Sequence, residues 1–354
     1  MPRLLTLHIV RHVLGTTAVV ALAMLSIYSF ISLVTEADET GKGGFGVVQL
    51  LQTTLLQLPT GLALQMPIIA MIGALMGLGI LSGQGELTAM RAAGFSVAKI
   101  AVATLFAGAV LGAAGWLVSE VLAPAGERAA DEVKARARGV PVAAGRAVWL
   151  RDGDQVLRIR SLLAEDRAEG VEIYRLGPDF RLSQVLAADA AEYHDGRWQL
   201  SGVRETRIIE DGRAETAQRA TSEWRGAVTP NVLKLYVLEA QAISVGGLRR
   251  LIGYLDENQL DAQQYRLQLW RKLIEPLTVM AMALFAVPFA FGGLRDSGAG
   301  QRLLIGILLG VGFYVVNRVS LSLGQIYGWP PLLAAGTPTL VWALLGCWRI
   351  SRLR

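Results

Sequence analysis

Six long runs of apolar residues constrain the fold of this chain more than any other feature. A helix that crosses the hydrocarbon core of a bilayer needs about 17–25 mostly apolar residues, and each run has that length. The runs span Val13–Val34, Pro59–Leu81, Val97–Ser119, Leu273–Leu294, Leu303–Leu323 and Leu332–Trp348. The first run is too long for the core of a signal peptide, so we interpret it as an anchor. The sequence therefore predicts a membrane protein with six transmembrane helices.

Charged residues are concentrated in one part of the chain. It has 34 basic and 29 acidic residues, and 18 of the former and 19 of the latter fall between Ala125 and Ala240. Such segregation indicates a soluble domain inserted into a membrane protein. We therefore expect three parts: residues 1–124 with three spans, residues 125–240 with the soluble insert, and residues 241–354 with the last three spans.

Basic residues in the short loops predict the orientation, because cytoplasmic loops carry an excess of Lys and Arg. With the N-terminus inside, only Glu86 and Asp296 oppose the basic residues of the cytoplasmic segments. Those basic residues are Arg3, Arg11, Arg91, Lys99, Arg295, Arg302, Arg349, Arg352 and Arg354. The first outer loop instead has three acidic residues against Lys42. Both termini are thus predicted to be cytoplasmic, with the insert outside the membrane, which is the periplasm if the cell is Gram-negative.

The insert is predicted to fold as a β-domain. Its segments VLRIRSL, GVEIYRL and RWQLSGVRETRII alternate or are rich in β-branched and aromatic residues. Glycine adopts positive φ at little cost, so Asp-Gly pairs indicate turns. These pairs are Asp152-Gly153, Asp195-Gly196 and Asp211-Gly212. Several short strands at this spacing favour a β-sandwich or a jelly roll.

The segment ERAADEVKARARG, residues 127–139, predicts a helical extension of the third span. Its cations Arg128, Lys134 and Arg136 can hold phosphate groups. However, Glu132 is spaced i,i+4 from both Arg128 and Arg136, so a solvated, self-paired helix explains the same pattern. The residues alone leave both interpretations open.

Polar side chains also occur within the fifth span, where Arg318, Ser322 and Gln325 share one helical face. A charge at membrane depth is costly and usually faces protein or a wet cavity. This face can line a path for a polar or anionic headgroup, or Arg318 alone can snorkel to the outer interface.

Glycines spaced i,i+4 occur in the second, third and fifth spans. Glycine at this spacing lets helix backbones approach closely, either inside one bundle or against a second membrane subunit. The pairs are Gly73/Gly77, Gly108/Gly112 and Gly306/Gly310.

Several common catalytic motifs are missing from the sequence. It contains no phosphate-binding G-x-x-x-x-G-K-[ST], no HExxH and no nucleophile elbow. Cys347 is the single cysteine, and three scattered histidines are too few for a metal cluster. We predict that the chain binds no cofactor, metal or nucleic acid and is not an enzyme. If it moves a substrate, the energy comes from a partner that hydrolyses nucleotide.

The connector SGQGELTAMRAAGFS lies between the second and third runs and predicts a short helix at about residues 84–94. Glu86 lies near the helix start, where the helix dipole favours an anion. Leu87 and Met90 share a face, and Arg91 adds a positive charge. A short cytoplasmic helix of this kind can dock in a groove of an ATPase and carry its closure to the membrane. It can equally rest on the lipid headgroups.

The connector and its flanks, TGLALQMPIIAMIGALMGLGILSGQGELTAMRAAGFS, resemble the LptF/LptG permease family of the lipopolysaccharide exporter. The resemblance includes VSEVLAPAGERAADEVKARARG after the third span and ISVGGLRRLIGYLDENQLDAQQYRLQLWRKLIEPL before the fourth. It continues through FAFGGLRDSGAGQRLLIGILLGVGFYVVNR and thus covers nearly the whole chain. The segments FGGLRDS and DAQQY are more similar to the LptG branch of the family.

The resemblance implies six spans with a periplasmic β-jelly roll between spans three and four. It implies a heterodimer with an LptF-like sister permease on an LptB-like ATPase dimer, which uses ATP and Mg. It also implies an LptC-like membrane-anchored partner and an LptA-like periplasmic bridge. The implied substrate is lipopolysaccharide, extracted from the inner membrane and passed toward the outer membrane.

Individual residues take roles only through this resemblance. Glu86 matches the coupling-helix acid that contacts the ATPase, and Lys134 and Arg136 match the cationic segment that contacts lipid phosphates. LptG proteins can also carry lysines around the outer end of span one. Here SFISLVTEADETGKG retains only Lys42, so phosphate contacts from that region are not implied.

Two other classes of membrane protein share part of this pattern. A mechanotransmission subunit of an ABC complex also couples an ATPase to a periplasmic domain, but it moves no lipid through its own spans. A gradient-driven transporter needs a site for a coupling ion, and the predicted spans contain no chain of Asp, Glu or His that would relay protons.

Overall fold

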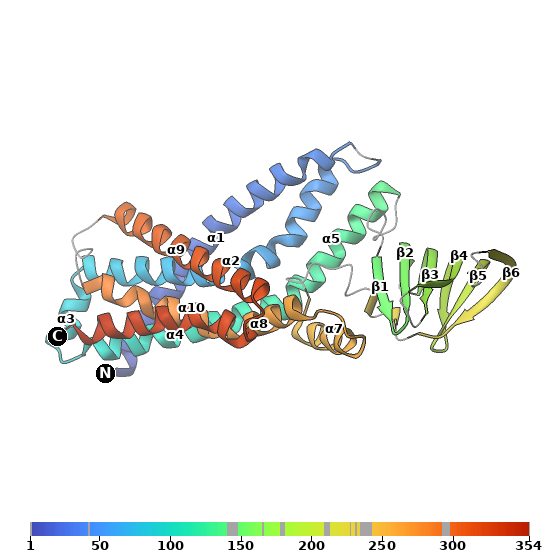
Figure 1. The fold of residues 1–354 in the computed structure, drawn as a ribbon. Helices are drawn as coiled ribbons and strands as arrows, with labels where there is room; N and C mark the ends of the chain where they lie inside the picture. The colour runs from blue at the N-terminus through green and yellow to red at the C-terminus, as the bar shows by residue number, and fades with distance from the viewer. Residues whose placement is uncertain are drawn as a thin grey trace. The chain divides into compact units, whose positions relative to one another are not determined.

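The computed structural model divides the chain into two compact units (Figure 1). The membrane unit contains Met1–Glu36, Thr54–Glu127 and Arg266–Arg354, and the inserted unit contains Ala37–Thr53 and Arg128–Tyr265. The structure describes residues 2–41, 43–139, 148–164, 166–177, 181–208, 213–226, 228–230, 232–233, 243–291 and 298–353. Lys42, the predicted turn at Asp211-Gly212, the segment 292–297 of the FGGLRDS motif with Arg295 and Asp296, and Arg354 lie outside these residues.

Six helices in the described part of the chain are long and apolar enough to cross a membrane, as predicted. They contain α1 (Pro2–Glu36), α2 (Val47–Gly83), α4 (Val97–Leu117), α8 (Gln263–Phe291), α9 (Ala299–Ile326) and α10 (Pro331–Ser351). A short 3-10 turn, η1 (Ala37–Glu39), follows α1. Helix α4 continues through a π-helical turn, η2 (Val118–Leu122), into α5 (Ala123–Arg138). The predicted extension of the third span is therefore confirmed.

The three glycine pairs allow close packing between helices of this chain. A side chain at Gly73 would collide with α1, and a Cβ at Gly112 would lie 2.8 Å from the carbonyl oxygen of Pro276 in α8. A Cβ at Gly310 would lie 2.8 Å from Cγ2 of Ile68 in α2. Each pair thus serves packing inside one bundle.

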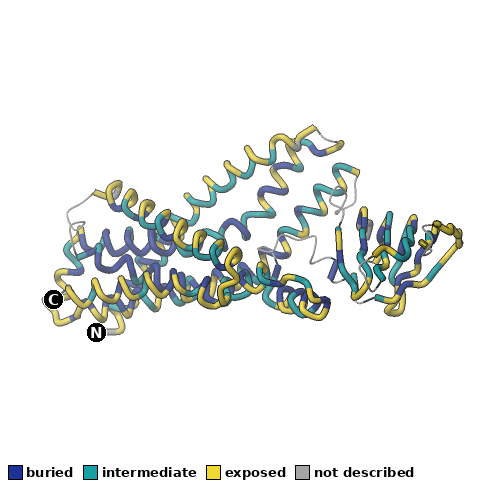
Figure 2. The backbone as a smooth tube through the Cα atoms, in the orientation of Figure 1, coloured by how far each residue is buried: buried dark blue, intermediate teal, exposed yellow. Residues whose placement is uncertain are grey.

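The helices of the membrane unit differ in how much apolar surface they bury (Figure 2). The buried share of the most apolar window is 67% for α2 and 56% for α8, but only 6% for α1 and 17% for α9. Helices α2, α4 and α8 supply most of the large buried core. Helices α1 and α9 therefore keep long apolar faces that the described part of the chain does not cover.

The insert forms one antiparallel sheet in which neighbouring strands are consecutive in sequence. Its strands are β1 (Val148–Asp152), β2 (Gln155–Ala164), β3 (Arg167–Leu176), β4 (Leu182–His194), β5 (Arg197–Ile208) and β6 (Ala214–Trp224). The predicted turns at Gly153 and Asp195-Gly196 are present, with φ values of 60°, 49° and 80°. The predicted fold class, six spans with a β-domain inserted between the third and fourth, is confirmed.

Helix α7 (Val245–Glu257) belongs to the same unit as the sheet and packs on its first hairpin. Ser244 caps its N-terminus. The hydroxyl of Tyr254 donates to the carbonyl of Arg151 at 2.7 Å, and the amide of Gly153 donates to Oδ1 of Asn258 at 3.1 Å. These bonds fix α7 against β1 and the turn that follows it.

Candidate functional site

The polar connector folds as a short helix, α3 (Glu86–Ala92). Gly85 and Gly94 flank it with φ values of 76° and 82°, a backbone conformation that favours glycine. At its C-terminal end, the amide of Phe95 donates to the carbonyl of Met90 at 2.9 Å. This bond and the left-handed Gly94 close the helix as a Schellman motif. The helix therefore has a defined start and end.

Leu87 and Met90 hold α3 against the membrane unit. Their exposed fractions are 1% and 6%, and both lie in the core cluster that contains Leu78 and Phe95. Leu87 and Met90, which we predicted as part of the ATPase-coupling set, thus anchor the helix to the bundle and do not face outward. The side chains of α3 that face outward are Thr88, Ala89, Arg91 and Ala92.

The acid at the start of α3 contacts the first membrane helix. Nε2 of His8 in α1 lies 2.7 Å from Oε2 of Glu86, and both side chains are partly exposed. The ring of His12 lies 4.6 Å from that of His8. Sequence reasoning weighed these histidines only as metal ligands and missed this contact. The sequence feature that could have indicated this contact is the i,i+4 spacing of the two histidines at the predicted cytoplasmic end of span one.

The predicted phosphate-contacting cations do not share one face of α5. Residues i and i+2 of an α-helix are rotated by about 200° about the helix axis, so the side chains of Lys134 and Arg136 point to opposite sides. Arg128 and Arg136 are about 80° apart, and both side chains are exposed. Nη2 of Arg136 lies 2.9 Å from Oε2 of Glu132, which is the self-pairing that the spacing predicted.

The three polar residues of span five do share an exposed face. Arg318, Ser322 and Gln325 are all exposed on α9. On another face of the same helix, Oγ of Ser320 donates to the carbonyl of Ala334 at 2.7 Å and joins α9 to α10. The exposed polar face thus continues the apolar surface of α9 that the described residues leave uncovered.

A buried ion pair links the helices of spans three and four. Nζ of Lys272 in α8 lies 3.4 Å from Oε1 of Glu120 and donates to the carbonyl of Ser119 at 3.2 Å. Both acceptors lie in the π-helical turn η2, and the two charged side chains are 6% and 14% exposed. Sequence reasoning missed this pair. Its signal was position: Glu120 follows the predicted third span and Lys272 precedes the fourth, on the same side of the membrane.

Comparison with known proteins gives a consistent result over the full length. A family model described as "Lipopolysaccharide export system permease LptF/LptG" matches residues 7–352. The chain is 30% identical to the lipopolysaccharide export system permease protein LptG of Escherichia coli over 342 residues, which is 95% of each chain. It is 29% identical to LptG of Haemophilus influenzae over 351 residues, 98% of each chain. The chain therefore belongs to the LptF/LptG family of lipopolysaccharide export permeases.

Proposed function

We propose that this chain is the LptG-type permease subunit of an ATP-driven exporter that extracts lipopolysaccharide from the inner membrane and passes it to a periplasmic bridge. The observation that carries this proposal is the full-length similarity to two LptG proteins, together with the six spans and the inserted β-domain. The chain itself is a non-catalytic membrane subunit, and a separate LptB-like dimer hydrolyses ATP with Mg. The other proposed partners are an LptF-like sister permease, an LptC-like anchored protein and an LptA-like bridge.

The ATPase is proposed to bind the outward face of α3. This face contains Thr88, Ala89 and Arg91, with Glu86 at its start. Because Leu87 and Met90 fix the helix to the buried core, a push on its outer face moves the bundle rather than the helix alone. This rigid attachment supports a coupling role better than a helix resting loosely on headgroups does.

The uncovered apolar faces of α1 and α9 are proposed to face lipid or the sister permease. Burial of each CH₂ group contributes about 0.8 kcal/mol, so an apolar surface that runs along a whole transmembrane helix suits acyl chains. Arg318, Ser322 and Gln325 continue the surface of α9 with polar groups. We assign them to the lining of a cavity that accepts a polar headgroup.

The cations of α5 are proposed to contact lipid phosphates. Arg128 and Arg136 share an exposed side of the helix, and a guanidinium group binds phosphate oxygens in a bidentate manner. Lys134, the third cation predicted to contact phosphate, lies on the opposite side of the helix from Arg136. In the proposed orientation both termini are cytoplasmic, and α5 and the β-domain lie in the periplasm.

Affinity purification from native membranes, with mass spectrometry of protein and lipid, tests this function. We expect a soluble ATPase, a second six-span permease and bound lipopolysaccharide. An ATPase without lipid would favour a mechanotransmission subunit. Recovery of neither partner would contradict the proposal, because the chain contains no nucleotide-binding motif of its own.

A further inference from the structure

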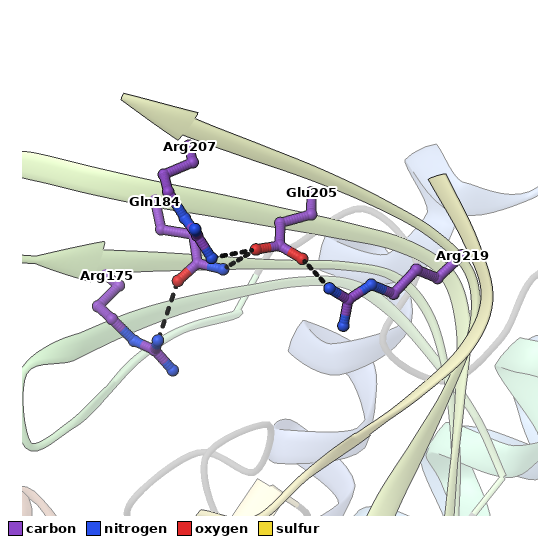
Figure 3. A network of polar contacts seen from close by, with 5 residues as sticks. All are labelled: Arg175, Gln184, Glu205, Arg207 and Arg219. Atoms are coloured by element: carbon purple, nitrogen blue, oxygen red, sulfur yellow. Dashed lines mark hydrogen bonds and ion pairs between the residues drawn. The ribbon is translucent and has the colours of Figure 1, made fainter. Parts of the chain in front are cut away.

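Three charged residues are buried in the described part of the chain, and they differ in what they connect. Glu205 belongs to a network of side chains within the β-sheet, where its Oε2 lies 3.4 Å from Nη2 of Arg219 (Figure 3). Lys272 pairs with Glu120 between spans three and four. Arg302 is 7% exposed and lies near the start of α9, at the predicted cytoplasmic end of span five. A charged group is kept from water only where its surroundings compensate for the lost hydration, so the packing around Arg302 bears on its role.

The side chain of Arg302 crosses from α9 to α2 and lies against two glycines there. A Cβ at Gly79 would lie 2.6 Å from Cδ and 2.9 Å from Nε of Arg302, so this side chain occupies the space that any larger residue would need. A Cβ at Gly83, one helical turn further, would lie 3.4 Å from Nη2, which is an ordinary contact. We call this packing of Arg302 against Gly79 and Gly83 the Arg302 contact.

Helix dipoles favour this placement of the guanidinium group. The N-terminus of a helix carries partial positive charge and the C-terminus partial negative charge, so a cation is stabilised at a C-terminus. Arg302 lies close to the N-terminus of its own helix, which begins at Ala299. Its guanidinium group instead lies beside the last turn of α2, which ends at Gly83. The charge therefore favours attachment of Arg302 to α2.

The end of α2 that Arg302 contacts leads directly into the proposed docking helix α3. Only Gln84 and Gly85 separate α2 from α3. The amides of both residues donate at 3.0 Å to carbonyls in the last turn of α2. Because the connector is hydrogen-bonded to this turn, a displacement of α3 also displaces the segment that Arg302 contacts.

The other described contacts between α9 and α2 are apolar. A Cβ at Gly306 would lie 3.2 Å from Cγ1 of Ile72, so the two helices are close one turn after Arg302 as well. Helix α2 contains no charged residue, and Arg318, the other arginine of α9, is exposed. Arg302 therefore supplies the charged contact between these two helices in the described part of the chain.

We propose that Arg302 is a positioning residue that transmits a movement of α3 to span five. When α3 is pushed, the end of α2 moves with it, and the Arg302 contact carries this movement to α9. The inference rests on the proposed function for the source of the movement, which is an ATPase bound at α3. It adds a defined route from α3 through the end of α2 to α9, all within the membrane unit.

The first test measures the lipid released per ATP hydrolysed by the permease complex reconstituted in vesicles. Arg302→Met keeps an apolar stem but removes the charge, so it should lower this ratio several-fold while ATPase binding is retained. Arg302→Lys keeps a cation and should restore most of the ratio. If Arg302 only stabilised the fold, the melting temperature would fall while the ratio of the assembled complex stayed at the wild-type value, and the inference would be wrong.

Two glycine variants form a matched pair for the same measurement. Gly79→Ala places a methyl group where the side chain of Arg302 lies, so it should lower the ratio of lipid released to ATP hydrolysed. Gly83→Ala makes only an ordinary contact one turn away and should keep the wild-type ratio. Equal losses in both variants would assign the effect to the packing of α2 in general and overturn the role of Arg302.

A readout that needs no lipid separates this inference from the proposed function. Ser322 lies on the exposed face of α9, and Cys347 is the single cysteine of the chain. The rate of maleimide labelling of Ser322→Cys in a Cys347→Ser background therefore reports movement of span five. We expect ATP with vanadate to change this rate in the complex that retains Arg302, and Arg302→Met to abolish the change.

The two readouts together decide between the possible failures. If the labelling rate responds as expected but no lipopolysaccharide is released, the route through Arg302 stands and the export function fails. If lipid is released and the labelling response is the same with Arg302 and with Met at this position, the inference is wrong and the export function stands. A labelling rate that ATP does not change in the complex with Arg302 would also overturn the inference.

Discussion

Nε2 of His8 lies 2.7 Å from Oε2 of Glu86, so the start of α1 holds the acid at the start of α3. The two residues are 78 positions apart in the sequence. This contact joins span one directly to the proposed docking helix. Because His8 orients Glu86 without belonging to α3, it is a positioning residue for the proposed contact with the ATPase.

Replacement of His8 should weaken docking of the ATPase. A side-chain hydrogen bond contributes about 0.5–1.5 kcal/mol, so His8→Ala should lower the affinity for the ATPase about 2- to 10-fold. His8→Gln is the control, because its amide can still donate to the carboxylate of Glu86. Surface plasmon resonance with the immobilised permease measures both. Equal affinity of His8→Ala and wild type would show that this bond does not position Glu86 for docking.

Buried and exposed residues of α3 should behave differently. Ala89→Arg places a bulky charge on the outward face, so it should abolish ATPase binding while the melting temperature stays unchanged. Leu87→Ala removes a fully buried side chain and should cost about 2–5 kcal/mol of stability. Thermal unfolding and ATPase pull-down on the same two variants check this. If the Leu87→Ala protein stays stable but no longer binds the ATPase, Leu87 contacts the ATPase directly.

The spans could be predicted from sequence because a bilayer imposes one length and one composition on every crossing helix. Helix α5, the extension of the third span, could be predicted as well, since the i,i+4 spacing of its charged residues is a local property of the sequence. The burial of Leu87 and Met90 in the core of this chain could not be predicted, because apolar residues on a short helix fit a partner groove and the chain's own core equally well. The His8–Glu86 and Lys272–Glu120 pairs join residues far apart in sequence, so their positions at the ends of the spans indicate a side of the membrane but not a partner.

The two sides of α5 should differ in their contact with lipid. Combined charge reversal, Arg128→Glu with Arg136→Glu, should reduce crosslinking of lipopolysaccharide to a photoreactive probe on α5 several-fold. Lys134→Glu changes charge on the opposite side of the helix and should have a smaller effect. Assembly with the partners should be retained in both, because all three side chains lie on a partly solvated helix. Equal crosslinking in both variants and the wild type would favour a self-paired helix without lipid contacts.

The stability of the β-domain should depend on pH through Glu172. The hydroxyl of Tyr174 donates to its carboxylate at 2.5 Å, Arg158 lies 2.9 Å away, and both lower the pKa of Glu172. The stabilisation is fully present above about pH 4.3, near which an unfolded glutamate titrates, and the stabilisation is lost as pH falls through the lower pKa of the folded state.

Tryptophan-detected unfolding of the intact protein between pH 7 and pH 3 measures this dependence. Glu172→Gln cannot ionise, so its stability should fall less steeply with pH below about 4.3. An unchanged slope in this variant would mean that other carboxylates dominate acid unfolding of the domain.

The Lys272–Glu120 pair gives the sharpest test of packing between spans three and four. Lys272→Met leaves Glu120 buried without its cation, and loss of one partner of a buried pair costs about 3–5 kcal/mol. Adding Glu120→Leu removes the stranded charge, so the double variant should recover most of that stability. Melting temperatures in detergent, measured for the wild type, both single variants and the double variant, complete a double-mutant cycle. Simple additivity of the two single effects would mean that the charges are solvated separately in the folded protein. If the double variant is stable but transports less lipid per ATP, the pair and its π-helical turn contribute to the transport movement as well as to the fold.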